Sequence, residues 1–155
     1  MVTMPIIRGM DVGKIVTQLV VTNRGDQVRA ANGDISADRI RSVTLDNVIV
    51  DTGATTLCLS ADTIAQLGLE MLREVRILTA NGPGRARIFQ DAKISLLGRE
   101  GTFECLELPG GTDPLIGVIP LEALGVELNL QEQTVRLLPD NSDDTFYTIY
   151  TLARP

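Results

Sequence analysis

The sequence contains no histidine and no tryptophan, and its aromatic residues are only two tyrosines and three phenylalanines. Without histidine, the chain cannot form Ser-His-Asp or Cys-His catalysts, and most zinc sites are excluded as well. Any proton transfer must therefore depend on carboxylates, lysine, tyrosine or a thiol. The scarcity of aromatic residues also implies a core that is mostly aliphatic.

Cysteine is scarce too. Cys58 and Cys105 are 47 positions apart, a separation that matches no metal-binding or redox motif. We interpret both as reduced, buried residues that behave as small hydrophobic side chains. The sequence therefore predicts no metal site and no cofactor.

Positive charge is in the minority, with 14 Lys and Arg residues against 20 Asp and Glu residues and a net charge of −6. This acidity argues against nucleic acid, which binds basic surfaces, and against adhesion to anionic membranes. No apolar run approaches the roughly 18 residues of a membrane span, and the amino terminus has no signal-peptide pattern. We therefore expect a soluble, cytoplasmic protein.

The chain of 155 residues, of which 44% are hydrophobic, is long enough for one domain with a real core. Its pattern is mostly β, and the first two strands are expected to form a hairpin. The third strand is expected to break in two near Asp46. Short helices are predicted over 60–69 and 120–125, strands over 14–21, 26–31, 38–50, 74–80, 85–97, 101–108 and 114–119, and a final hairpin over 127–138.

The stretch "NVIVDTGATTLCLS" places a carboxylate at the end of an apolar strand, where Asp51 is followed by Thr52 and Gly53. An Asp in such a place is usually a turn former, and a lone Asp-Thr-Gly is a weak signal. The surroundings are more specific. An apolar-apolar-Gly triplet stands 64 residues after Asp51 and opens a short helix, and a hairpin with the glycine-rich segment "NGPG" lies between them.

The motifs "VDTGAT", "TANGPG" and "PLIGVIPLEALG" follow one another in this order. In order and spacing, the chain resembles the retropepsin family, the retroviral-type aspartic proteases, and closely resembles their bacterial relatives. The resemblance implies a mostly-β fold, a closed β-barrel of the acid protease type with one lobe per chain and one or two short helices. It also implies an amino-terminal β-hairpin extension of the same domain over 1–42, a protease core over 43–138 and a carboxy-terminal tail over 139–155.

By the same resemblance, Asp51, Thr52 and Gly53 form the catalytic loop of an aspartic endopeptidase. Such an enzyme needs two carboxylates that face one water, and because like charges so close cannot both ionise, they share one proton. The chain has only one Asp-Thr-Gly. A two-fold axis through the site would supply the second carboxylate, so the resemblance implies a homodimer that acts on extended peptides.

The resemblance also assigns roles to the neighbouring residues. Gly53 allows the tight turn, and Thr52 holds the two loops together across the dimer axis. A segment that packs against the Asp51 loop has a positioning role and consists of Leu115, Ile116 and Gly117. Substrate-binding residues are expected after the loop and in a flexible flap at the hairpin, namely Ala54, Thr55, Ala80, Asn81, Gly82, Pro83 and Gly84.

Two other readings stay open. The same dimeric fold could bind extended peptides without cutting them, or the hairpins could merely assemble a larger complex with Asp51 as a structural turn. Activity on denatured protein, blocked by a transition-state-mimicking inhibitor, separates these readings from an endopeptidase. The aromatic tail segment Phe146–Leu152 could lie in a neighbour's cleft or pack as an edge strand.

Overall fold

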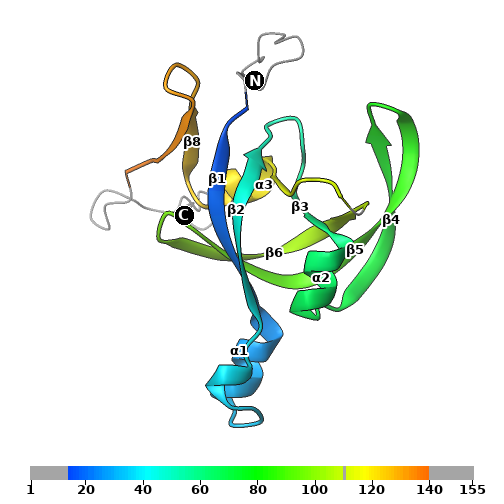
Figure 1. Ribbon diagram of the computed structural model, residues 1–155, viewed down its shortest axis with the longest axis vertical. Helices are drawn as coiled ribbons and strands as arrows, with labels where there is room; N and C mark the ends of the chain where they lie inside the picture. The colour runs from blue at the N-terminus through cyan, green and yellow to red at the C-terminus, as the bar shows by residue number, and fades with distance from the viewer. Residues whose placement is uncertain (1–13, 110, 140–155) are drawn as a thin grey trace, which may run out of the picture.

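The computed structural model describes residues 14–109 and 111–139, and strands dominate it (Figure 1). The strands are β1 (Val16–Asn23), β2 (Ser42–Val50), β3 (Leu57–Ser60), β4 (Met71–Thr79), β5 (Gly82–Leu96), β6 (Arg99–Leu108), β7 (Leu115–Ile116), β8 (Val126–Asn129) and β9 (Thr134–Leu137). The helices are α1 (Arg24–Ala31), the 3-10 turn η2 (Ala37–Arg39), α2 (Ala61–Leu67) and α3 (Val118–Ala123).

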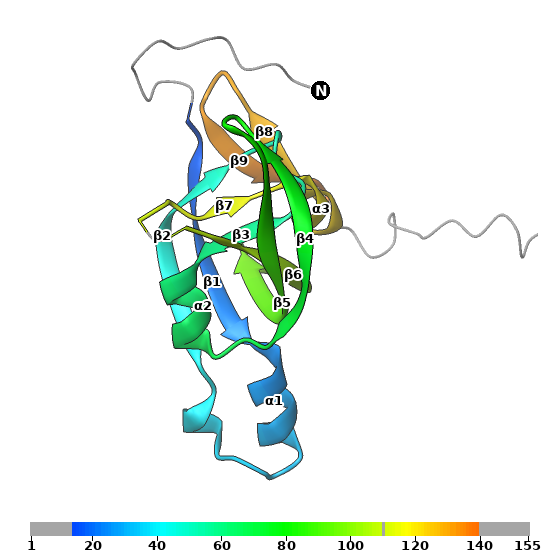
Figure 2. The ribbon, with the colours of Figure 1, turned by 90° about the vertical axis from the view of Figure 1, so that its right-hand side faces the viewer.

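The main sheet has the strand order β1-β2-β7-β3-β6-β5-β4, and an additional pairing of β1 with β5 closes six of these strands into a ring. β4 pairs only with β5 and extends the hairpin beyond the ring, as Figure 2 shows. Two pairs are parallel, β2 with β7 and β3 with β6. The predicted closed, mostly-β barrel is confirmed, and β1 is an integral strand of it.

The core inside the ring is aliphatic, as predicted. Apart from Phe89 and Cys105, its buried side chains are aliphatic, and they come from every part of the ring, for example Leu19, Val48 and Leu59. Cys58 and Cys105 are both buried and form no disulfide. This packing fixes where the strand ends lie, and therefore where the loop that carries Asp51 emerges.

The predicted strand over 26–31 is wrong, because Arg24–Ala31 is the helix α1. The segment has no apolar face to bury in a sheet. Instead, the side chain of Asn23 caps the helix by accepting a hydrogen bond from the backbone N–H of Asp26 at 3.0 Å. β1 therefore pairs with β2 and not with 26–31, and α1 and η2 form the connection at one end of the molecule (Figures 1 and 2).

The predicted break near Asp46 is also wrong, because β2 runs without interruption from Ser42 to Val50. A register shift occurs there instead. Between the pairs Thr17–Val48 and Leu19–Leu45, the single residue Gln18 lies opposite two residues of β2. This bulge bends the strand while keeping it whole, and the Gln18 side chain donates to Asp46 Oδ1 at 2.9 Å.

The other predicted elements are present with shifted ends. Ser60 caps α2 and Gly68 ends it at a φ of 65°. The β4–β5 turn contains only Ala80 and Asn81, so the glycine-rich segment lies in β5 and not at the tip. α3 begins before Pro120. The tail segment over 146–152 lies outside the described residues, and none of the described helices is long and apolar enough to cross a membrane.

Candidate active site

Asp51 follows the last residue of β2, at the point where β2 lies parallel to β7. Its backbone N–H donates to the carbonyl oxygen of Ile116 at 3.0 Å. The pairs Ile49–Leu115 and Val50–Ile116 align the two strands. The two motifs that lie 64 residues apart in the sequence are thus joined by backbone hydrogen bonds.

The turn after Asp51 holds its carboxylate. The backbone N–H of Gly53 donates to Asp51 Oδ1 at 2.8 Å, and the N–H of Ala54 donates to the Asp51 carbonyl at 3.1 Å. A Cβ atom at position 53 would lie 3.1 Å from the same carboxylate oxygen, so glycine suits this close approach. No described residue donates to Asp51 Oδ2, and this half-buried carboxylate keeps one oxygen available.

The segment after β7 holds the Asp51 loop in place through backbone hydrogen bonds. The N–H groups of Val118 and Ile119 donate to the carbonyls of Ala54 and Thr55, each at 3.0 Å. At Gly117 a Cβ atom would lie only 2.5 Å from the Ala54 carbonyl oxygen, so no larger residue fits without moving the loop. Leu115, Ile116 and Gly117 thus lie against the Asp51 loop, and their positioning role stays a prediction.

A groove of about 760 Å³ opens above Asp51. Its lining comes mainly from the Asp51 loop, from β3 and β6 and from β4 of the hairpin. Of the predicted residues, Asp51, Gly53, Ala54, Thr55, Ala80 and Leu115 line the groove. The other lining residues are Thr56, Cys58, Arg73, Val75, Arg76, Ile77, Leu78, Thr79, Ile88, Glu104, Leu106, Leu108 and Ile119.

Some predicted residues lie elsewhere. Thr52 is half-buried in the turn and does not line the groove, and its role across a dimer axis stays a prediction. Asn81 lies in the two-residue turn, whereas Gly82–Gly84 belong to β5 and pair with Ile77–Thr79. Their predicted contact with a substrate also stays a prediction. The edge that borders the groove is instead β4, whose consecutive residues 75–79 all line it.

Three charged residues that line the groove were not predicted from the sequence, namely Arg73, Arg76 and Glu104. Arg73 on β4 and Glu104 on β6 form a two-point ion pair, with Nη1–Oε1 and Nη2–Oε2 distances of 3.0 and 2.8 Å. Hydrogen bonds to Arg73 lower the pKa of Glu104, and the same contacts raise the pKa of Arg73. Nothing in the local sequence signals this pair, because it depends on how β4, β5 and β6 align.

Cys58 also lines the groove, but its environment makes it a poor nucleophile. Burial, together with the charge of nearby Asp51, raises the pKa of its thiol to about 11. Burial likewise raises the pKa of Cys105 to about 12. Because a thiol reacts as the thiolate, neither cysteine is suited to covalent catalysis near neutral pH. Asp51 therefore stays the candidate catalytic residue of the groove.

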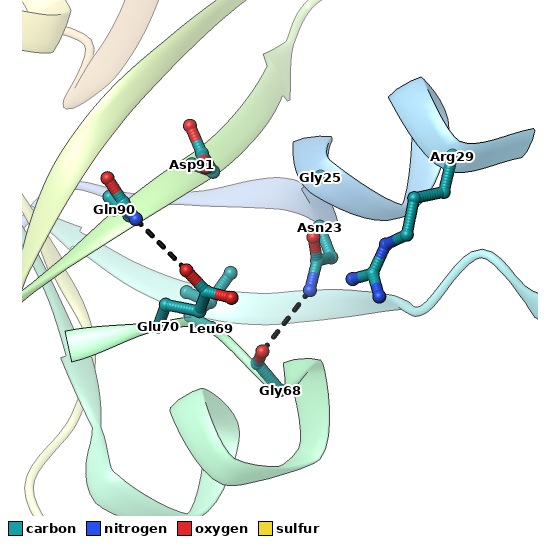
Figure 3. Close-up of a pocket in the computed structure, with 8 residues that line it drawn as sticks. All are labelled: Asn23, Gly25, Arg29, Gly68, Leu69, Glu70, Gln90 and Asp91. Atoms are coloured by element: carbon teal, nitrogen blue, oxygen red, sulfur yellow. Dashed lines mark hydrogen bonds between the residues drawn. The ribbon is translucent and has the colours of Figure 1, made fainter. Parts of the chain in front are cut away.

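A second, polar cavity of about 380 Å³ lies between α1, the end of α2 and β5 (Figure 3). It shares no lining residue with the groove. Asn23 donates to the carbonyl of Gly68 at 3.4 Å, and Gln90 donates to Glu70 at 3.2 Å, as Figure 3 shows. Among the described residues, no cluster of His, Cys, Asp or Glu could hold a metal ion in either cavity.

Residues 46–122 match the model of a protein family described as "gag-polyprotein putative aspartyl protease". The matched segment includes both the Asp51 loop and the Leu115–Gly117 segment that supports it. No curated protein matches the chain significantly. The assignment to a bacterial branch stays a prediction. This match supports the predicted resemblance to the retropepsin-like, retroviral-type aspartic proteases.

Proposed function

We propose that the protein is an aspartic endopeptidase, active as a homodimer in which the Asp51 carboxylates of two chains activate one water. The observation that carries this proposal is the position of Asp51 beside the groove, with one carboxylate oxygen held by Gly53 and the other available. Retropepsin-like proteases generally act on peptides as dimers, which agrees with a single catalytic motif per chain.

The mechanism requires the two carboxylates to share one proton, because two charges this close would repel each other strongly. The charged carboxylate takes a proton from the water as the water oxygen attacks the peptide carbonyl carbon. The protonated carboxylate gives its proton to the carbonyl oxygen. When the C–N bond breaks, the carboxylate that acted as base gives its proton to the leaving amine, and the other carboxylate takes a proton from one hydroxyl of the tetrahedral intermediate, which restores the shared proton.

The second carboxylate would come from a second chain, since the described residues offer the groove no other free acid. Besides Asp51, the only acidic residue among those described that line the groove is Glu104. Both oxygens of Glu104 accept hydrogen bonds from Arg73, and this lowers the pKa of Glu104. A carboxylate held in its charged form cannot supply the proton that the carbonyl oxygen needs.

The hairpin would serve as a flap that covers an extended substrate. Within the described residues, the edge of β4 that faces away from β5 is unpaired, and residues 75–79 of this strand line the groove. A peptide could therefore add to this edge as a further strand. Pro83, which has no N–H to donate, lies in β5, so it removes no donor from the β4 edge.

The test is to replace Asp51 with Asn, which keeps the shape and removes the titrating group. We expect the cleavage of denatured protein to fall by at least about a thousandfold while the fold and the dimer persist. The matched control is Asp46→Asn, which changes an exposed carboxylate five residues earlier on the same strand. A variant at position 51 that still cuts at more than a trace of the wild-type rate would place the catalyst elsewhere. Tight binding of a reduced-amide peptide without any cleavage by the wild type would instead indicate a binding module.

A further inference from the structure

We propose that the Arg73–Glu104 ion pair determines substrate specificity, by making one subsite of the groove select a carboxamide side chain, Gln or Asn. This inference rests on the proposed function, because it names the substrate class of the same groove. It concerns a pair of side chains that neither the family match nor the sequence motifs assign.

The ion pair lies on the face of the sheet that lines the groove. Arg73 pairs across β4 and β5 with Ile88, and Ile88 pairs across β5 and β6 with Leu106, two residues from Glu104. Residues that lie opposite one another, or two apart on a strand, share a face. All four residues line the groove.

The pair is also attached to the loop that carries Asp51. Thr56, five residues after Asp51, donates from its hydroxyl to the backbone carbonyl of Glu104 at 3.2 Å. β3 and β6 then run parallel from the pair Leu57–Cys105 onward. A substrate side chain near the Asp51 loop would therefore lie within reach of the pair.

The pair keeps unused hydrogen-bonding capacity. Its two contacts occupy two of the five guanidinium N–H groups and one lone pair on each carboxylate oxygen. The side chains of Arg73 and Glu104 are 51% and 46% exposed. Donors of Arg73 and acceptors of Glu104 therefore remain accessible side by side, next to the apolar residues Val75, Ile88 and Leu106.

This arrangement favours one kind of substrate side chain. An apolar side chain laid over the pair would remove its water without replacing the hydrogen bonds, which is unfavourable. A charged substrate side chain would be attracted by one member of the pair and repelled by the other. A carboxamide supplies an acceptor for Arg73 and donors for Glu104 without a net charge, and its methylene stem suits the apolar neighbours.

Arg76 also lines the groove, but its side chain lies on the other face of the hairpin from Arg73. It lies three residues from Arg73, so the two side chains leave β4 on opposite faces. Its cross-strand partner, Arg85, does not line the groove. Within the described residues, Arg73–Glu104 is therefore the ion pair that faces the groove.

The experiment compares the kcat/KM values of peptides that differ at a single position, which holds Gln, Leu, Glu or Lys. This position is scanned along the peptide. For the wild type we expect one position near the cut site where Gln is preferred over the other three. Glu104→Gln removes the carboxylate that pairs with Arg73, so the preference at that position should shift toward Glu by about tenfold. Arg73→Gln should shift the preference toward Lys by a similar factor.

Two further variants act as controls. Glu107→Gln breaks the Arg87–Glu107 pair, which joins β5 to β6 through contacts of 2.8 Å but does not line the groove, and it should keep the wild-type ranking. The double variant Arg73→Glu/Glu104→Arg reverses the pair and keeps it neutral. It should retain the preference for Gln, and it tests the proposal even if a single variant fails to fold.

Binding of the same peptides as non-cleavable reduced amides, measured by calorimetry, separates this inference from the proposed function. Opposite shifts in affinity without any cleavage would support the subsite and overturn the endopeptidase. If the peptides are cleaved but Glu104→Gln and Arg73→Gln do not shift the side-chain preference in opposite directions, the subsite alone is overturned. The same holds if the control Glu107→Gln shifts the preference as Glu104→Gln does. Peptides that are neither cut nor bound would overturn both.

Discussion

At the scale of single residues, Asp26 shows how a polar network replaces apolar packing under α1. It is almost fully buried, and Asn23 is the only other polar residue buried as deeply in the described chain. Its carboxylate accepts two hydrogen bonds from the Arg41 side chain, one from the Arg41 backbone and one from Arg29, at 2.9 to 3.0 Å. Chiefly through the Arg41 side chain, these contacts lower the pKa of Asp26 to about 2.

The Asp26 network predicts a loss of stability in acid. Because the pKa of Asp26 is lower in the folded chain than the ordinary value of 3.8, its contribution is complete above pH 4 and is lost as the pH falls toward 2. Both arginines are about half exposed, so solvent screening reduces this contribution to about 1 kcal/mol. We expect Asp26→Asn to lower the free energy of unfolding at pH 7 and the difference from wild type to shrink toward pH 2.

Urea unfolding of both proteins at several pH values between 7 and 2 measures this difference. Asp34→Asn is the matched control, since Asp34 is exposed and its side chain makes no hydrogen bond or ion pair within the described residues. A difference between wild type and Asp26→Asn that stays constant down to pH 2 would mean that the Asp26 carboxylate does not stabilise the fold through its charge.

The positions of some residues beside the groove could be predicted from the sequence, and those of others could not. Asp51 and Gly117 could be placed together in advance, because each stands in a short motif whose order and spacing resemble a known family. The pairing of Arg73 with Glu104 could not be predicted. It depends on the register across three strands, including the bulge in β5 between Phe89 and Ala92, and no local pattern specifies that register.

At the scale of elements, the largest difference between the predicted and the observed structure is the helix α1. Hydrogen bonds at its first turn explain this difference. The segment after β1 contains turn residues and one large apolar side chain, Val28, and its sequence alone resembles a short strand. The helix forms there because Asn23 caps it and Arg41, fifteen residues after Asp26, binds the first turn. Such a long-range contact is invisible to patterns of alternation, whereas α2 was predictable because its own residues, Ser60 and Gly68, cap it.

The β4–β5 hairpin, which we propose as a flap, gives a further prediction. Gly82 has a φ of 106°, which side chains rarely adopt, although a Cβ atom there would touch nothing within 4 Å. Gly82→Ala should therefore strain the turn locally. We expect kcat/KM to fall by roughly tenfold because the neighbouring groove residues Leu78–Ala80 shift, while the free energy of unfolding changes by only about 1 kcal/mol.

Gly84→Ala is the matched control in the same strand. Its Cβ atom would meet only Ile77, at an ordinary contact distance of 3.7 Å, and Gly84 has no positive φ. Urea unfolding and peptide cleavage are measured for both variants. Equal losses of kcat/KM in the two variants would show that the flap responds to any added methyl group and not to backbone strain at the turn.

At the scale of the whole molecule, the closed ring could be predicted only through the family resemblance. Alternation along the chain indicates a small barrel or sandwich, but it does not say that β1 pairs with β5 to close the ring. In the same ring β2 and β7 are parallel neighbours, and this pairing sets the Asp51 loop against Gly117. The geometry beside the groove is therefore a consequence of the whole fold.

The last prediction concerns assembly. If each active site needs Asp51 from two chains, a mixed dimer of wild type and Asp51→Asn should be inactive. After unfolding and refolding an equal mixture together, the activity per total chain should be about one quarter of the wild-type value, whereas independent monomers would give about one half. An equal mixture with Asp46→Asn, which changes a carboxylate outside the groove, should keep nearly full activity. Activity that falls only to one half, with a mass in solution that corresponds to one chain, would show that a single copy of this protein cuts peptides by itself.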